Sequence, residues 1–89
     1  MKRIRVRVYG DVQGVFFRHF TKKTARKLGL NGWCRNEGDG SVLIVVEGEE
    51  RSVDEFEAWS HKGSPMAVVE RVDVTVEKYE GQEGRFEVR

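Results

Sequence analysis

The sequence predicts an α+β fold in which strands and helices follow one another in the order βαββαβ, with a short extra strand at the end. Three observations support this. Apolar and polar residues alternate with the period of half-buried strands, two other stretches have the spacing of amphipathic helices, and an Asp-Gly turn joins two apolar segments. The 89 residues fit a single domain, 1–89, and leave little room for a second one.

The first strand and the first helix are indicated by different periods. Near the N-terminus every second residue is apolar and arginines stand between; the apolar positions are Ile4, Val6 and Val8. After a break from Gly10 to Phe16, helical spacing places on one face Phe17, Phe20, Thr24 and Leu28. Gly29 is a typical helix stop. We therefore expect a strand followed by a helix.

A hairpin is expected next. The segments 30–36 and 41–48 have the apolar character of strands. Between them stands Glu37-Gly38-Asp39-Gly40, whose Asp-Gly pair is typical of tight hairpin turns. The two segments should form an antiparallel pair.

The second half of the chain predicts a helix and two strands. Ser52 and Glu55 have the spacing of a capping box, which predicts a helix that runs to about Lys62 and stops at Gly63. The alternation that predicts the fourth strand is carried by Val72, Val74 and Val76. After the turn at 80–84, a short terminal strand is predicted by Phe86 and Val88.

This order of elements is that of a ferredoxin-like sandwich, in which two helices cover one face of an antiparallel sheet. Many unrelated activities use the arrangement, so function has to be argued from sites and not from the fold. Hydrophobic residues make up 38% of the chain, enough for a modest core. The aromatic residues expected in it are Phe16, Phe17, Phe20, Trp33, Phe56, Trp59 and Phe86.

The net charge and the number of cysteines exclude several classes of protein. Sixteen basic and fifteen acidic residues leave a net charge of +1, so no overall field would attract nucleic acid or an anionic membrane. The single cysteine, Cys34, excludes an intramolecular disulfide and a multi-cysteine zinc site. The N-terminus lacks the apolar run of a signal peptide, and no stretch is long enough to span a membrane. We expect a soluble protein of the cytoplasm.

The segment from Gly10 to Arg18 has the properties of an anion-binding loop. It ends where the first helix is expected to begin, and there successive backbone N–H groups and the positive end of the helix dipole attract a phosphate. Gly14 allows close approach of the backbone, and the planar guanidinium of Arg18 can bind two phosphate oxygens. Taken alone, a tight turn and a solvated arginine explain these residues equally well. The segment lacks the P-loop and dinucleotide patterns, so the predicted site holds one terminal phosphate and no cofactor.

Two segments together resemble the two signatures of the acylphosphatase family. They are Gly10-Asp11-Val12-Gln13-Gly14-Val15-Phe16-Phe17-Arg18 and Gly29-Leu30-Asn31-Gly32-Trp33-Cys34-Arg35-Asn36-Glu37-Gly38-Asp39-Gly40-Ser41-Val42. Their separation and the order of elements also agree with the family, so the resemblance extends over essentially the whole chain. This sequence differs from the family pattern at two positions, and neither has a role in the proposed chemistry. Cys34 stands where the family often has valine, and Ser64 stands where a proline commonly precedes the one that matches Pro65.

The resemblance implies hydrolysis of the carboxyl–phosphate bond of a small acyl phosphate, which yields a carboxylate and inorganic phosphate. It implies that Arg18 and the loop backbone bind the phosphate and that Asn36 orients the attacking water. The loop residues concerned are Gln13, Gly14, Val15, Phe16, Phe17 and Arg18. Because an acyl phosphate is already activated, we expect no metal and no other cofactor. We also expect a monomer that binds neither nucleic acid nor membrane, with inorganic phosphate as product and inhibitor.

Several other reactive or charged residues have simpler explanations. His19 and His61 are distant in sequence, and with one cysteine they are poor evidence for a metal site. Cys34, Trp33 and the phenylalanines at 16, 17 and 20 are expected to pack in the core. A further group of basic helix residues is expected to be solvated and not to bind phosphate: Lys22, Lys23, Arg26 and Lys27.

Two alternatives remain. The first is a noncatalytic nucleic-acid-binding module of the same topology, which the near-zero net charge and the absence of an RNP1 pattern disfavour. The second lies within the family, since related domains occur at the front of hydrogenase-maturation carbamoyltransferases, where carbamoyl phosphate is the relevant substrate. A chain of this length fits the free-standing form better.

Overall fold

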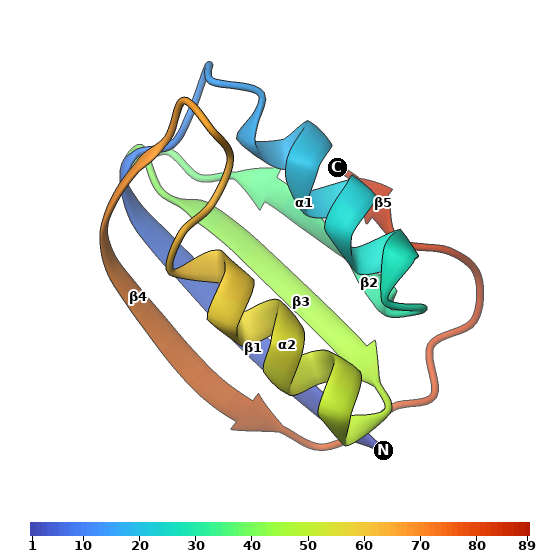
Figure 1. The fold of residues 1–89 in the computed structure, drawn as a ribbon. Helices are drawn as coiled ribbons and strands as arrows, with labels where there is room; N and C mark the ends of the chain where they lie inside the picture. The colour runs from blue at the N-terminus through green and yellow to red at the C-terminus, as the bar shows by residue number, and fades with distance from the viewer.

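Two helices cover one face of a five-stranded sheet in the computed structural model, which describes residues 1–89 (Figure 1). The elements in chain order are β1 (Lys2–Asp11), α1 (Phe17–Lys27), β2 (Asn31–Asn36), β3 (Val42–Gly48), α2 (Glu50–Ser60), β4 (Val68–Glu77) and β5 (Glu87–Val88). The predicted βαββαβ order with a short terminal strand is confirmed. Neither helix has the length and apolar character that a membrane-spanning helix needs.

The strands are arranged in the order β4-β1-β3-β2-β5. Strands β4, β1, β3 and β2 pair with one another in antiparallel fashion, as expected. The terminal strand β5 instead pairs in parallel with β2, with Val88 opposite Cys34, so the sheet as a whole is mixed. The reason lies in the connection after β4, which crosses to the far edge of the sheet before β5 begins (Figure 1). This edge strand therefore lies directly beside β2.

The core lies between the sheet and the two helices. On β1 and β3, alternate residues face each other as fully buried pairs: Ile4 with Val46, Val6 with Ile44, and Val8 with Val42. Phe17 of α1 and Phe56 of α2 complete the layer from the helix side. Burial of each such side chain contributes roughly 1.5–3 kcal/mol relative to exposure, so this layer is what holds α1 in place over the sheet.

The buried stripe of α1 differs from the prediction. Thr21 and Ala25 are buried with Phe17, whereas Phe20, Thr24 and Leu28 are only partly buried. Thr21 tolerates this position because its hydroxyl donates a hydrogen bond of 2.8 Å to the carbonyl of Phe17. The buried residues have the regular i, i+4, i+8 spacing of a helix face. The middle residue is polar, so a search for apolar periodicity does not select this face.

The predicted capping box of α2 is wrong. The helix begins at Glu50, two positions before Ser52, and no side chain caps its first turn. Strand β3 remains paired through Gly48, which lies opposite Lys2, so only Glu49 separates the strand from the helix. The predicted stop is confirmed: Gly63 has a φ of 73° and its N–H donates to the carbonyl of Trp59 at 2.8 Å.

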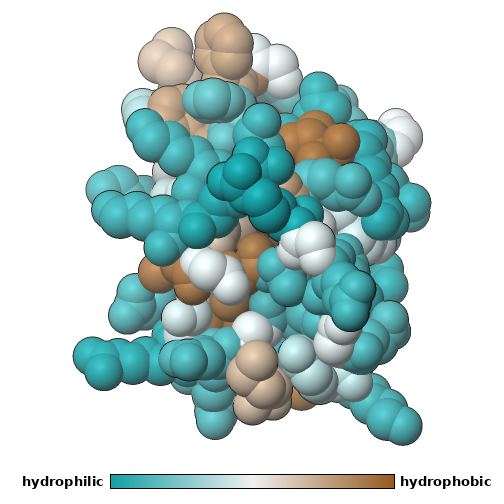
Figure 2. All heavy atoms as spheres, turned by 90° about the vertical axis from the view of Figure 1, so that its right-hand side faces the viewer, coloured by the Kyte–Doolittle hydropathy of each residue, from teal (hydrophilic) through white to brown (hydrophobic).

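The sheet face opposite the helices is covered by ion pairs. Arg3 bonds to the buried carboxylate of Glu47 at 2.9 Å, and Arg5 bonds to Glu77 at 2.8 Å. Trp33 packs on this face in a small cluster with Leu43 and Val45, which confirms the expected packing role of its ring. The surface on the side of the β4–β5 connection is mainly hydrophilic, with small separate apolar spots (Figure 2). Single exposed apolar residues of this kind are normal on protein surfaces.

Candidate active site

The segment between β1 and α1 forms a tight loop because of its glycines. The register of β1 against β4 shifts between Tyr9 and Gly10, and a Cβ on Gly10 would lie only 2.1 Å from the carbonyl oxygen of Val68. Gly14 has a φ of 76°, in the left-handed region that favours glycine. These two positions allow the chain to leave the sheet, curl and enter α1 within a few residues.

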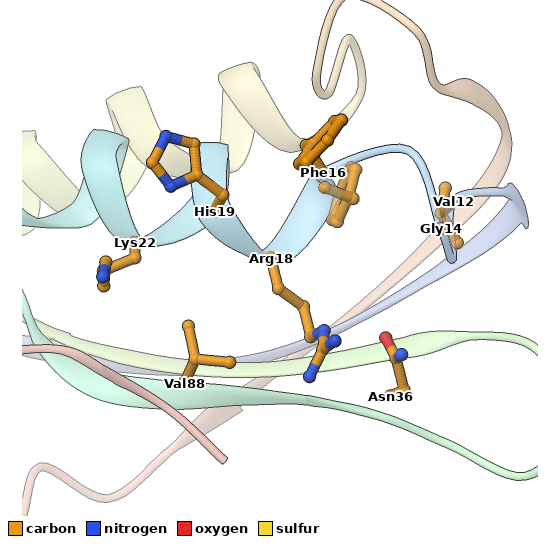
Figure 3. Close-up of a pocket in the computed structure, with 9 residues that line it drawn as sticks. Val12, Gly14, Phe16, Arg18, His19, Lys22, Asn36 and Val88 are labelled. Atoms are coloured by element: carbon orange, nitrogen blue, oxygen red, sulfur yellow. The ribbon is translucent and has the colours of Figure 1, made fainter.

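Phe16 is the N-cap residue of α1, and its backbone is left-handed with a φ of 57°. Its side chain is 75% exposed, so the expectation that Phe16 packs in the core is wrong. The left-handed backbone directs the ring away from the sheet (Figure 3). No side chain caps the helix and no acidic residue stands in its first turn, so the first backbone N–H groups are available to an anion.

A cavity of about 360 Å³ lies between the start of α1 and the end of β2 (Figure 3). Arg18 and Asn36 both line it, the two residues expected to act on a phosphate and on a water. The side chain of Arg18 points from α1 toward the sheet, and the amide of Asn36 points from the sheet toward the start of α1 (Figure 3). The complete lining is Val12, Gly14, Phe16, Phe17, Arg18, His19, Lys22, Asn36 and Val88.

The fold explains why these two side chains meet. Asn36 is the last residue of β2 and lies opposite Val42, a core residue, so its side chain is on the helix face of the sheet. After the turn at Gly29, β2 runs back under α1, which places the start of the helix above the end of the strand (Figure 1). Arg18 in the first turn of α1 therefore lies over Asn36.

The cavity carries positive charge without compensation. Arg18 and Lys22 make no ion pair, and no aspartate or glutamate is among the lining residues. The arginines of β1 on the opposite face, in contrast, are all paired with carboxylates. The amide of Asn36 makes no hydrogen bond within the chain, because none of the side-chain hydrogen bonds involves it. The site therefore offers unused donors to an anion.

Gln13 holds the loop in place through its side chain. Its amide nitrogen donates hydrogen bonds of 2.9 Å to the carbonyl oxygens of both Glu37 and Ser41, in the turn that follows Asn36. Gln13 and Val15 do not line the cavity, whereas Gly14, Phe16, Phe17 and Arg18 do. Gln13 was expected to act through its backbone only, because a sequence pattern gives no partner for a polar side chain.

Lys22 and Val88 complete the cavity, and neither was expected there. Lys22, which was expected to be solvated, is partly buried and lines the cavity. The available signal was its spacing: residues four apart on a helix share a face, which puts Lys22 on the side of Arg18. Val88 reaches the cavity because β5 pairs with β2.

The two histidines are exposed. His19 lies at the rim of the cavity, and its ring contacts Phe20 edge to face, with 5.4 Å between the ring centroids. His61 lies at the C-terminal end of α2, outside the cavity. No three His, Cys, Asp or Glu side chains gather into a cluster of metal-ligating groups.

Cys34 lies fully buried two residues before Asn36 on the same face of β2. Burial raises the pKa of its thiol to about 12, since the thiolate is poorly solvated there, and the positive charges of Arg18 and Lys22 oppose the shift only in part. A thiol with so high a pKa is a poor nucleophile at neutral pH, which supports the packing role expected for Cys34.

Comparisons with known proteins point to one family. A family model described as acylphosphatase matches residues 4–88. The chain is 52% identical over 88 residues to an acylphosphatase of Rubrobacter xylanophilus, covering 99% of this chain and 80% of that protein. It is 50% identical over 86 residues to an acylphosphatase of Thermococcus kodakarensis, covering 94% of each. The crystal structure of acylphosphatase from Bacillus subtilis matches with a TM-score of 0.95 and 37% identity, over 100% of this chain and 99% of that one.

Proposed function

Since the chain belongs to the acylphosphatase family, we propose that it hydrolyses acyl phosphates with Arg18 holding the phosphoryl group and Asn36 orienting the attacking water. The observation that carries this assignment is that both side chains line one cavity and that neither has a partner within the chain. The products are a carboxylate and inorganic phosphate.

The phosphoryl group binds at the start of α1. Its oxygens accept hydrogen bonds from the guanidinium of Arg18 and from the uncapped N–H groups between Gly14 and Arg18. The backbone donors are held by the fold before substrate arrives, so they stabilise the charge of the transition state without reorganising. The absence of acidic residues from the lining strengthens the attraction for a phosphoryl group.

The water lies on the sheet side of the phosphorus. The side-chain oxygen of Asn36 accepts a hydrogen bond from it, and this directs an oxygen lone pair toward phosphorus, opposite the leaving carboxylate. A new P–O bond forms to the water while the P–O bond to the acyl group breaks, and the carboxylate leaves with the electron pair. Orientation of this kind lowers a barrier by roughly 7–11 kcal/mol in favourable systems.

No strong general base is needed in this scheme. An amide such as that of Asn36 does not accept a proton at neutral pH, and the exposed His19 has no carboxylate to orient it. We assign the proton of the attacking water to a phosphoryl oxygen of the substrate. A carboxylate leaves readily without protonation, so the reaction also needs no acid and no metal ion.

Hydrolysis of benzoyl phosphate in the presence of EDTA tests this function. We expect full turnover with the chelator and competitive inhibition by inorganic phosphate, because phosphate binds the same donors as the substrate. A protein that needs an added divalent ion, or that leaves benzoyl phosphate intact, contradicts the proposal.

We further propose that the enzyme works as a monomer in the cytoplasm. The only cysteine is free and buried, as is compatible with a reducing compartment. Sedimentation at working concentration tests the first statement, and a species of twice the mass of the chain contradicts it.

A further inference from the structure

The cavity is larger than the phosphate that the proposed function places in it. Its volume of about 360 Å³ falls within the roughly 300–1,000 Å³ typical of pockets that hold a whole small molecule. Gly14, Arg18 and Asn36 surround one end, and Lys22 and Val88 lie toward the other (Figure 3). With the phosphoryl group against Arg18, the acyl group therefore extends along α1 toward Lys22.

The far end of the cavity carries a cation with no partner. Lys22 follows Arg18 by one helical turn, which places its Cα about 6 Å further along the helix axis. It forms no ion pair, and the lining contains no carboxylate that would neutralise it. Lys2, by comparison, bonds to Asp54 at 2.9 Å. An unpaired ammonium group in a partly enclosed site attracts a ligand anion.

The wall between the two cations is apolar. Val88 lies on the helix face of β5, opposite Cys34 of β2, and its side chain stands between Lys22 and Arg18 in the view of the cavity (Figure 3). An acyl chain of a few methylene groups can pack on this valine. The cavity therefore offers a phosphoryl site, an apolar middle and a cationic end, in that order.

We propose that Lys22 is a specificity-determining residue that favours acyl phosphates whose acyl group ends in a second carboxylate. The proposal rests on the proposed function and adds the class of substrate: the monophosphorylated anhydride of a short dicarboxylic acid. A carboxylate carries one negative charge, which matches the single ammonium of Lys22. A second phosphate would bring nearly two charges to one cation.

Two substrates of equal length test this assignment. Succinyl phosphate ends in a carboxylate, and butyryl phosphate has a methyl group in the same place, so the ratio of their kcat/KM values isolates the second charge. Lys22→Gln removes the ammonium. Lys23→Gln is the matched control, because the neighbouring Lys23 is exposed and does not line the cavity. Its Nζ lies 6.0 Å from the centroid of the Phe20 ring.

We expect the wild-type protein to prefer succinyl phosphate and Lys22→Gln to reduce that preference about three- to tenfold, mainly through KM. Lys22→Arg should restore the preference, and Lys23→Gln should keep it. The preference should also shrink with added salt, since the cavity is open to solvent. If Lys22→Gln keeps the wild-type ratio, or lowers turnover of both substrates equally, the role of Lys22 is wrong. Hydrolysis of neither substrate by the wild-type protein would instead contradict the proposed function itself.

Discussion

The side-chain amide of Gln13 donates a 2.9 Å hydrogen bond to the carbonyl oxygen of Glu37, the residue that follows Asn36. A second bond of the same length reaches the carbonyl of Ser41 across the turn. The loop that is proposed to bind the phosphate is thus tied directly to the end of the strand that carries Asn36, whose amide is proposed to orient the water. Gln13 thereby links the segment that leads into Arg18 to the segment that follows Asn36.

Replacement of Gln13 should therefore impair turnover although its side chain lies outside the cavity. We expect Gln13→Ala to lower kcat about tenfold, because small misplacements of reacting groups are costly, and to destabilise the fold by about 1–3 kcal/mol. Gln13→Glu keeps the size but cannot donate, so it should be at least as slow. Steady-state kinetics and urea unfolding check this. Loss of stability with an unchanged kcat would reduce Gln13 to a purely structural residue.

Arg18→Ala should lower kcat/KM by about 10²–10³ and weaken inhibition by inorganic phosphate, since both depend on the guanidinium. Arg51→Ala is the matched control: this arginine is 92% exposed on α2, and its removal changes the net charge equally. We expect the control to keep wild-type kinetics. Normal phosphate inhibition in Arg18→Ala would show that the anion binds elsewhere.

The two asparagines of β2 should give opposite results. Asn36→Ala should lower kcat by about 10²–10³ with little change in stability, because the exposed amide has no partner in the chain. Asn31 at the other end of the strand donates a 2.8 Å bond to the carbonyl of Gln82. Asn31→Ala should therefore lose about 1 kcal/mol of stability and keep its kcat. The assignment fails if the two variants cannot be distinguished by turnover.

The buried thiol of Cys34 makes stability depend on alkaline pH. Its pKa is raised from 9.0 to about 12 in the fold, so between these values the unfolded chain holds fewer protons than the folded one. The free energy of unfolding then falls as pH rises. We expect a loss of roughly 1–2 kcal/mol between about pH 8 and about pH 10.5 that is absent from Cys34→Val. Urea unfolding at the two pH values measures it, and equal losses in both proteins would contradict the assignment.

The buried ion pair on the open face of the sheet should be important for stability. Glu47 is 1% exposed and bonds to Arg3 at 2.9 Å, and it also accepts hydrogen bonds from the backbone N–H groups of Glu80 and Gln82. Glu47→Ala removes the nearest of three carboxylates from Arg3 and leaves two backbone N–H groups without their acceptor, so we expect a loss of about 1–3 kcal/mol. Glu87→Gln breaks only an exposed pair with Arg89 and should change stability by less than about 1 kcal/mol. Thermal or urea unfolding distinguishes the two.

Much of this fold could be predicted because the periodicity of strands and the residue preferences of tight turns are visible in short stretches of sequence. The alternation of Ile4, Val6 and Val8 has one explanation, a strand with one buried face, and the Asp-Gly pair of the hairpin selects a tight turn. Arg18 was proposed from the loop before the first helix and Asn36 from the family resemblance, and both residues line one cavity in the structure. Sequence spacing alone does not show that two residues from different elements converge.

The missed features depend on contacts between distant segments. The capping motif at Ser52 was misleading because the pairing of Gly48 with Lys2 sets where β3 ends and α2 begins. The parallel pairing of β5 depends on the path of a loop, which carries no periodic signal. Phe16 has the composition of a core residue, yet its left-handed backbone turns it outward. In each case tertiary geometry overrode a local preference.

The pairing of β5 with β2 has a consequence for how activity relates to folding. Val88 near the C-terminus and Gly14 near the N-terminus line the same cavity, and Asn36 comes from the middle of the chain. The lining residues extend from Val12 to Val88, so only a fragment that contains almost the whole chain can form the cavity, and without β5 one wall is missing. Turnover regained during refolding should therefore report molecules in which β5 is paired with β2 and the long-range contacts around the cavity are complete.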